Sequence, residues 1–212
     1  SDCLVGSEMC IRDSIWTGGD EGVYMSRSID SGESWEQTSI RISPIEVIST
    51  TFPQVDAGDP GRIAITYLGS ENSSELGEPD IDGENWTGNA HYATTNVSYH
   101  LYITLSLNAL DPSPTFYTYR VTDDPVQIGS ICLNSGDCRD IGGSNRNLLD
   151  FNDLHIDREG RVFVAFADGC TDSCASDSNS TAEDSRSRRG SVYFLGSGPS
   201  LYDSVGLMEM PF

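Results

Sequence analysis

FPQVDAGDPGRIAITYLGS, residues 52–70, occurs again in altered form as FNDLHIDREGRVFVAFADG, residues 151–169. The two segments align without a gap, so that Phe52 falls on Phe151 and Gly61 on Gly160. Each copy reads as a short strand, a tight turn of Asp, Pro or Gly, and a second strand of β-branched and aromatic residues. This repeat therefore predicts two β-hairpins of the same kind.

A second repeat interleaves with the first. GVYMSRSID (22–30) aligns with HLYITLSLN (100–108), and GSVYFLGSG (190–198) is a weaker third copy. A further strand-like segment follows each of the first two copies, EQTSIRIS (36–43) and FYTYRVT (116–122). The chain thus contains strands three and four of one unit, one to four of the next, and one to three of a third. Four-strand units in series predict an all-β fold, a β-propeller, with a β-sandwich as the main competitor.

The turn after the first of these strands reads SIDSGESW, with Ser28, Asp30, Gly32 and Trp35 at fixed spacing. Gly32 is expected to adopt a backbone angle that other residues resist, and the Ser28 and Asp30 side chains to bond the turn backbone. Trp35 is expected to fold back over the hairpin end and fill the space between blades. The spacing matches the Asp-box, S-x-D-x-G-x-x-W, and so resembles the bacterial-neuraminidase repeat of sialidase-like propellers.

The resemblance covers most of residues 18–169 and weakens after them. In the second copy of the turn only Ser106 and Asn108 remain, with Phe116 in the aromatic role. Sialidase-like propellers have six blades, so the resemblance implies a six-bladed sialidase-type propeller of which about two to two and a half blades are present. In that family the Asp-box is structural and lies away from the catalytic face.

A sialidase would need three arginines that clamp the substrate carboxylate, a Tyr nucleophile activated by a Glu, and an Asp as general acid/base. None of these motifs can be carried over to this sequence, so no catalytic residue is assigned. Arg62 and Arg161 lie at the repeated hairpin turn and are expected to stabilise it. The resemblance then implies a secreted propeller that binds a glycan or a protein through its axial face. The alternative is an exo-sialidase whose catalytic residues lie mostly in missing blades.

The best pocket candidates come from the strand expected nearest the propeller axis. Alternation in FNDLHID (151–157) places its polar residues on one face and its aliphatic residues on the other. Polar side chains also precede this strand and occupy the matching position of the first copy. We expect a ligand pocket formed by Gln54, Arg146, Asp150, Asp153 and His155. The alternative is that Asp150 pairs with Arg146 while Asp153 accepts hydrogen bonds from nearby backbone amides.

The charge balance limits the partners. The formal net charge is −21, and all 12 basic residues are Arg. Such a chain repels phosphate backbones and anionic headgroups, so neither nucleic acid nor a membrane is an expected partner. The same field steers anionic sialic acid away unless a local clamp overcomes it, which favours a binding protein over a sialidase.

Four cysteines form two close pairs in loops rich in Gly, Ser and Asp. We expect local disulfides Cys132–Cys138 and Cys170–Cys174, and pairing between the two loops remains the alternative. Disulfides imply an oxidising compartment, in agreement with a secreted or extracellular protein. Two loops rich in oxygen donors, EPDIDGENW (78–86) and ADGCTDSCASDSN (167–179), leave calcium as an alternative. However, their spacing does not fit an EF-hand, so we expect acidic surface loops, with no metal and no cofactor.

The segment SDCLVGSEMCIRDS, residues 1–14, has no strand or helix period. It resembles the translated read-through of a sequencing adapter, with an ordinary frayed N-terminus as the alternative. We therefore divide the chain into residues 1–14, a non-native leader, and residues 15–212, a partial sialidase-like propeller.

Overall fold

The computed structural model describes residues 11–17, 22–72, 90, 97–131, 148, 152–176, 189–202 and 207–209. The regular secondary structure of these residues is β-strand apart from the four-residue helix α1, which confirms the all-β prediction. The elements in chain order are β1 (Arg12–Thr17), β2 (Val23–Ser28), β3 (Ile40–Arg41), β4 (Ser49–Ala57), β5 (Ile63–Ser70), β6 (Ser98–Ser106), β7 (Tyr117–Arg120), β8 (Gln127–Ile128), β9 (Asn152–Ile156), β10 (Val162–Asp168), α1 (Ser173–Ser176), β11 (Arg189–Phe194), β12 (Ser197–Pro199) and β13 (Leu207–Glu209).

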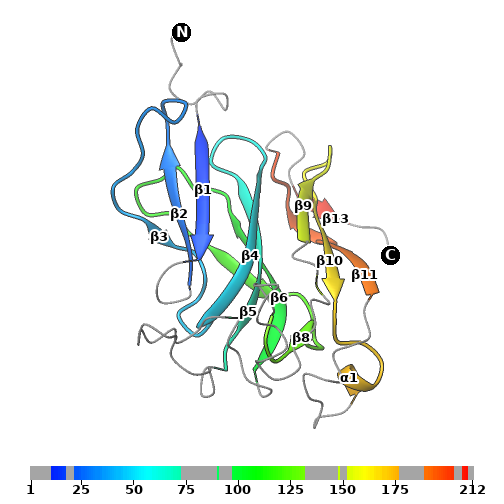
Figure 1. The fold of residues 1–212 in the computed structure, drawn as a ribbon. Helices are drawn as coiled ribbons and strands as arrows, with labels where there is room; N and C mark the ends of the chain where they lie inside the picture. Colours follow the sequence, from blue (N-terminus) through cyan, green and yellow to red (C-terminus); the bar gives the residue numbers. More distant parts are fainter. Residues whose placement is uncertain are drawn as a thin grey trace, which may run out of the picture.

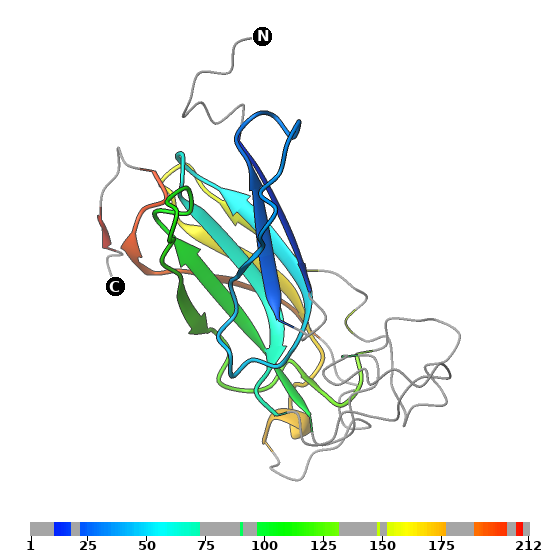
Figure 2. The same cartoon turned by 90° about the vertical axis from the view of Figure 1, so that its left-hand side faces the viewer.

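Three antiparallel sheets contain most of the strands (Figure 1). The first sheet has the order β1-β2-β3, the middle sheet β4-β5-β6-β7, and the third sheet β9-β10-β11. In addition, β8 pairs with β6, and β12 pairs with β13. Within the described residues no sheet closes on itself. Each sheet is a meander in which consecutive strands are neighbours, and Figure 2 shows the first sheet lying in front of the middle one.

Strand register confirms the ungapped alignment of the hairpin repeat. Ala57 lies opposite Ile63 in the β4–β5 pair, and Ile156 lies opposite Val162 in the β9–β10 pair. These are matching positions of the two copies. From Gln54 to Thr66 and from Asp153 to Ala165, the two hairpins therefore pair at matching positions.

In the structure, the third copy of the interleaved repeat is shifted by one residue from its position in the sequence alignment. Ser106 lies opposite Ile63 in the middle sheet, and in the third sheet the Leu195 amide donates to the Val162 carbonyl at 2.9 Å. Leu195 therefore matches Ser106, whereas the sequence alignment places Gly196 there. The register is fixed by pairing of β11 with β10, which stacks Phe194 on Phe163. Because side chains alternate along a strand, this shift exchanges the two faces of β11.

The sheets pack face to face, and each has a forward face, turned toward the next sheet in chain order, and a backward face. The forward face of the first sheet and the backward face of the middle sheet bury one apolar cluster, which includes Val23, Met25, Ile63, Ile65, Tyr67 and Tyr102. The forward face of the middle sheet and the backward face of the third bury another, which includes Ala64, Leu101, Ile103, Leu105, Leu154, Ile156, Val164 and Phe166. Each fully buried aliphatic or aromatic side chain contributes about 1.5–3 kcal/mol. Packing between faces therefore holds the three sheets together.

The segment between β12 and β13 forms hydrogen bonds with both hairpin turns. The Asp59 amide donates to the Leu201 carbonyl at 2.9 Å, and the Leu201 amide donates to the Gly160 carbonyl at 3.0 Å. An ideal Cβ on Gly160, where φ is 77°, would lie 1.9 Å from Ser200 Oγ. Only glycine therefore allows the chain to pass this close.

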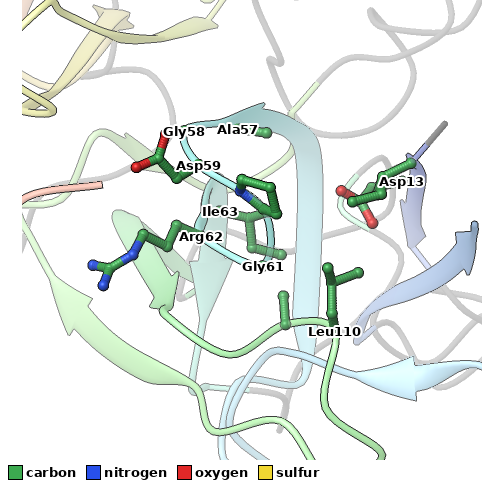
Figure 3. A pocket seen from close by; sticks show the side chains of 11 residues that line it. Asp13, Ala57, Gly58, Asp59, Gly61, Arg62, Ile63 and Leu110 are labelled. Atoms are coloured by element: carbon green, nitrogen blue, oxygen red, sulfur yellow. The ribbon is translucent and has the colours of Figure 1, made fainter. Parts of the chain in front are cut away.

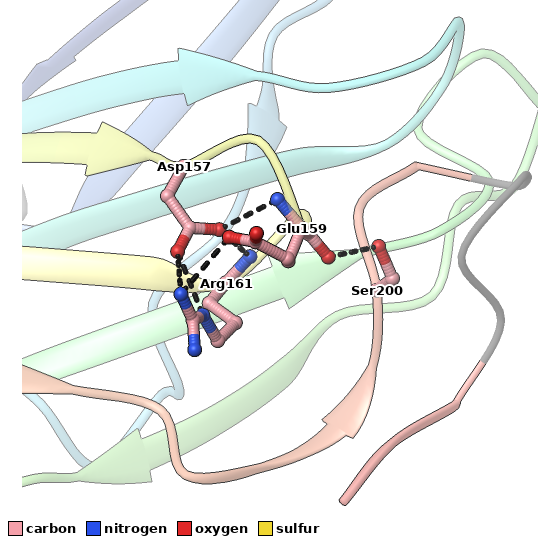
Figure 4. Close-up of polar contacts among 4 residues, drawn as sticks. All are labelled: Asp157, Glu159, Arg161 and Ser200. Carbon is pink, nitrogen blue, oxygen red and sulfur yellow. Dashed lines mark hydrogen bonds and ion pairs between the residues drawn. The ribbon is translucent and has the colours of Figure 1, made fainter. Parts of the chain in front are cut away.

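The repeated arginines stabilise these turns, as expected. Arg161 Nε donates to Asp157 Oδ2 at 2.7 Å, and its Nη2 donates to Glu159 at 2.9 Å (Figure 4). Arg62 Nη1 donates to the Ser200 carbonyl at 2.9 Å.

Strand β1 begins at Arg12, within the segment 1–14 that the sequence sets apart, and pairs with β2 along its whole length. The predicted disulfide Cys170–Cys174 is confirmed, and it joins the loop after β10 to Cys174 within α1. Cys132 and Cys138 lie outside the described residues. No helix in the described ranges is long and apolar enough to cross a membrane.

Candidate functional site

The SIDSGESW turn has the local hydrogen bonds that its spacing predicts. Ser28 Oγ accepts from the Gly32 amide at 2.8 Å and donates to Asp30 Oδ1 at 2.7 Å. Asp30 Oδ1 also accepts from the Ser34 amide at 2.9 Å. Gly32 has φ of 89°, in the left-handed region that glycine favours. Hydrogen bonds from the hydroxyl and amide of Ser34, with a further one from Ser28, lower the pKa of Asp30 to about 2.

The prediction for Trp35 is wrong in one respect. The indole does fold back toward the turn, because its Cζ2 lies 3.9 Å from an ideal Cβ on Gly32. However, Trp35 is 42% exposed and belongs to neither apolar cluster between the sheets. Trp35 therefore covers its own turn, while aliphatic residues and tyrosines of the strands fill the space between the sheets.

The second copy of the turn keeps part of this hydrogen-bond pattern although only two of the four residues match. The Asn108 amide donates to Ser106 Oγ at 3.3 Å, and Asn108 Oδ1 accepts from the Thr115 amide at 2.9 Å. Arg27, buried in β2, connects the two turns: it pairs with Glu36 and donates to the carbonyls of residues 109 and 111. These turns are therefore structural elements of the first two sheets.

The polar pocket candidates lie on the edge strands β4 and β9, whereas the SIDSGESW turn follows β2 of the first sheet. Gln54 of β4 and Asp153 of β9 border an open depression beside the C-terminal half of β10. The depression has a volume of about 760 Å³. Its polar rim is formed by Gln54, Asn152 and Asp153; its remaining lining comes from β10 and β11. Arg146 and Asp150 lie outside the described residues.

Matching positions of the repeat come together across the edges of β4 and β9. Gln54 lies opposite Thr66, and Asp153 opposite Ala165, as the alignment predicts. Asp153 is exposed, and its Oδ1 accepts from the Leu154 amide at 3.0 Å, as the alternative interpretation expects. His155 is also exposed, and its Nδ1 lies 3.6 Å from Asp56 Oδ2.

Two residues of the site, Asp56 and Asn152, were missed by sequence reasoning. Asp56 Oδ2 accepts from the Ile156 amide at 2.9 Å and so joins the edge of β4 to that of β9. Asn152 Nδ2 donates to the Phe52 carbonyl at 2.9 Å, while its buried Oδ1 has no hydrogen-bond partner among the described residues. The repeat alignment could have identified Asp56, because it occupies the position of His155 in the first copy.

Backbone strain coincides with this cluster. Phe52 has φ of 53°, unusual for a bulky side chain, and the β4–β5 register shifts between Thr51 and Gln54. Bulges and strained residues are common next to binding sites, where they redirect side chains. Here the bulge turns the Phe52 carbonyl toward Asn152 of the neighbouring sheet. The inner-edge cluster, Gln54, Asp56, Asn152, Asp153 and His155, thus combines strain, an unsatisfied buried acceptor and exposed polar groups.

A smaller cavity of about 140 Å³ lies beside the β4–β5 turn (Figure 3). Asp13, Asp59 and Arg62 contribute to its wall. Burial raises the pKa of Asp13, the positive charge of Arg27 opposes this shift, and Glu36 adds to it. Arg62 already bonds the Ser200 carbonyl, whereas the buried Oδ1 of Asp13 has no hydrogen-bond partner among the described residues, so this cavity also holds one unsatisfied acceptor.

One tyrosine–glutamate pair is present, but it is not a nucleophile of the sialidase kind. Tyr102 Oη donates to Glu71 Oε1 at 2.8 Å. Burial, followed by the hydrogen bond and the negative charge of Glu71, raises the pKa of Tyr102, whereas a nucleophile requires an accessible oxygen that ionises easily. Tyr102 is also buried and stacked on Tyr67. The pair therefore belongs to the packing between the first two sheets.

The inner-edge cluster can hydrogen-bond a ligand, but its geometry does not indicate acid–base or metal chemistry. Within the described ranges no three His, Cys, Asp or Glu side chains are placed to hold a metal ion. No protein-family model, curated protein or solved structure matches the chain.

Proposed function

We propose that the three sheets are successive blades of a sialidase-like β-propeller that is secreted and binds an uncharged glycan through its axial face. The propeller assignment is supported by three meander sheets packed face to face and by the hydrogen-bond pattern of the SIDSGESW turn. The edge strands β4 and β9, joined through Asp56 and Asn152, would line the axis. The Cys170–Cys174 disulfide is consistent with an oxidising compartment.

The observation that carries the binding proposal is the buried, unsatisfied Oδ1 of Asn152 between the exposed side chains of Gln54 and Asp153. A sugar hydroxyl donates well to an amide oxygen or a carboxylate, and the Gln54 amide can donate in return. An unpaired buried acceptor costs about 1–3 kcal/mol, which a ligand hydroxyl could recover. Asp153 and the net charge of −21 disfavour an anionic sugar.

The test uses saturation-transfer NMR on the whole chain, with a panel of neutral galactose, N-acetylglucosamine and mannose oligosaccharides. Asp153→Asn and Gln54→Ala are expected to weaken binding by about tenfold each, the effect of one ligand hydrogen bond of about 1.4 kcal/mol. Asp123→Asn is the matched control, because it makes the same charge change at an exposed position after β7 and should leave binding unchanged.

Failure of every neutral sugar to bind, or equal affinity in all three variants, would contradict the glycan proposal. A fluorogenic sialoside serves as the probe for the exo-sialidase alternative. Hydrolysis of that sialoside by the wild-type chain would reverse the order of the two functions. A protein ligand on the same face would appear as loss of partner binding in Asp153→Asn without any sugar signal.

A further inference from the structure

Strand β7 is the outer strand of the middle sheet, and one of its two backbone edges faces away from that sheet. The sheet has the order β4-β5-β6-β7, so β7 pairs with β6 alone among the described strands. The Val121 amide donates to the Leu101 carbonyl at 2.8 Å. Because bonded positions alternate in an antiparallel pair, the odd-numbered residues of β7 also direct their backbone groups toward β6. The even-numbered residues, Thr118 and Arg120, therefore direct their backbone groups outward.

This outer edge has no partner in the described part of the chain. There the amide and carbonyl groups of Thr118 and Arg120 take part in no backbone hydrogen bond. A free edge of this kind is a site where another extended chain can add through main-chain hydrogen bonds. Strand β7 therefore offers donors and acceptors in the spacing that a further strand requires.

Two exposed tyrosines lie beside this edge, on the forward face of the sheet. Tyr117 and Tyr119 are 52% and 51% exposed. Their register partners on β6, Leu105 and Ile103, are buried in the cluster between the middle and third sheets. The rings therefore extend that apolar face outward to the free edge. A strand added to β7 would place every second side chain against these rings.

The backward face of β7 is polar. Thr118 Oγ1 lies 2.8 Å from Thr104 Oγ1, in a hydrogen bond between the two hydroxyls, and Arg120 is exposed. An added strand would therefore meet aromatic rings on its forward face and polar groups on its backward face.

The charges around β7 favour a basic partner. Asp111 precedes the strand, Asp123 and Asp124 follow it, and all three are exposed. Arg120 is the only charged residue within β7. The net charge of −21 attracts a cationic chain over long range and repels a second copy of this one. Guanidinium and ammonium groups also bind the faces of tyrosine rings.

We propose that β7 binds an extended basic peptide, which adds as a further antiparallel strand at the outer edge of the middle sheet. Antiparallel pairing continues the pattern of this sheet. Peptide residues opposite Thr118 and Arg120 exchange backbone hydrogen bonds with them. The residues between them place arginine or lysine side chains over Tyr117 and Tyr119. The proposal does not depend on glycan binding, which concerns β9 and the opposite edge strand of this sheet, β4.

Fluorescence anisotropy with labelled peptides and the whole chain tests the proposal. The probe alternates arginine and threonine over about seven residues, so that its arginines face the rings and its threonines lie opposite Thr118 and Arg120. N-methylation of the threonine amides removes the hydrogen bonds to β7 and should weaken binding about tenfold or more. N-methylation of the arginine amides, which point away from β7, is the matched control and should change the affinity by less than about threefold. A peptide with glutamate in place of arginine should not bind.

Protein variants locate the bound peptide. Tyr117→Thr and Tyr119→Thr should each weaken binding about twofold to fivefold, because each removes one contact between a cation and an exposed ring. Phe194→Thr is the matched control, because Phe194 is a 49% exposed aromatic residue on another outer strand, β11. It should leave the affinity unchanged. None of these changes alters the net charge, so general attraction to an acidic protein cannot produce the difference.

Equal affinity of the two methylated peptides would overturn the proposal, because a strand bonded along one edge must distinguish them. The reverse order of the two would reject antiparallel pairing. Equal affinity of all the protein variants would mean adsorption to an acidic surface and would also overturn the proposal. In sedimentation velocity without peptide, a dimer that dissociates in Tyr119→Thr would assign the edge to a second copy instead. If a tyrosine variant loses its far-UV circular dichroism, the methylated peptides on the wild-type chain decide alone.

Discussion

Two valines on opposite faces of the third sheet provide a matched test of the packing. Val164 is fully buried on the backward face, whereas Val192 is 64% exposed on the forward face. Val164→Ala removes two buried methyl groups at about 0.8 kcal/mol each, and the cavity left behind raises the loss to about 2–3 kcal/mol. Val192→Ala should cost less than about 0.5 kcal/mol. In a chain of this length these losses correspond to decreases in Tm of about 4–12 °C and less than about 2 °C.

Urea unfolding followed by circular dichroism gives both free energies directly. The protein should be at about 1 µM, so that association between copies adds little to stability. Equal losses in the two variants at this concentration would refute the assignment of faces, since β11 would then bury Val192. A loss below about 0.5 kcal/mol for Val164→Ala would refute the packing between the middle and third sheets.

Three further changes test local features. Hydrogen bonds lower the pKa of Asp30 from 3.8 to about 2, so its charged form stabilises the fold above pH 4. This contribution is lost as the pH falls from about 4 to 2. Asp30→Asn should therefore flatten the dependence of the urea midpoint on pH in that range. Replacing Cys170 and Cys174 by Ser should lower the unfolding free energy by about 2 kcal/mol, as expected for a short loop, and reduction of the wild type should match it. Gly160→Ala should lower the thermal midpoint strongly, because its Cβ would collide with the segment between β12 and β13, whereas Gly190→Ala meets nothing within 4 Å and should have little effect on that midpoint.

Much of the fold could be predicted because the hairpins repeat and their faces alternate. In FNDLHID the buried Leu154 and Ile156 and the exposed Asp153 and His155 lie where alternation places them. The register of β11 could not be predicted, because GSVYFLGSG aligns with HLYITLSLN almost equally well when it is shifted by one residue. Only the pairing of β11 with β10 decides between these two alignments. A single residue of error there would have assigned Val192 to the wrong face of the third sheet.

The candidate site was only partly predictable, because its geometry depends on contacts between sheets. Gln54 and Asp153 follow from the repeat alignment, since they occupy the same position in the two hairpin copies. The role of Asn152 depends on the Phe52 carbonyl, which a bulge 100 residues earlier in the chain turns toward it. No local pattern in either segment indicates that contact. The prediction for Trp35 was wrong for a related reason, since the exposed fraction of its side chain depends on the neighbouring sheets.

Comparison of matching positions separates packing from function in this chain. Matching positions inside the two hairpins both hold buried apolar residues, as Ile63 and Val162 do, and the physical requirement of a buried face explains the similarity. On the inner edge the copies differ in chemistry, with Asp56 opposed to His155 across the same seam. Packing alone does not require charged or titratable groups at an exposed edge. The edge formed by β4 and β9 is therefore where the sheets can differ in sequence without loss of the fold, and where substitutions that test the proposed ligand binding should first be made.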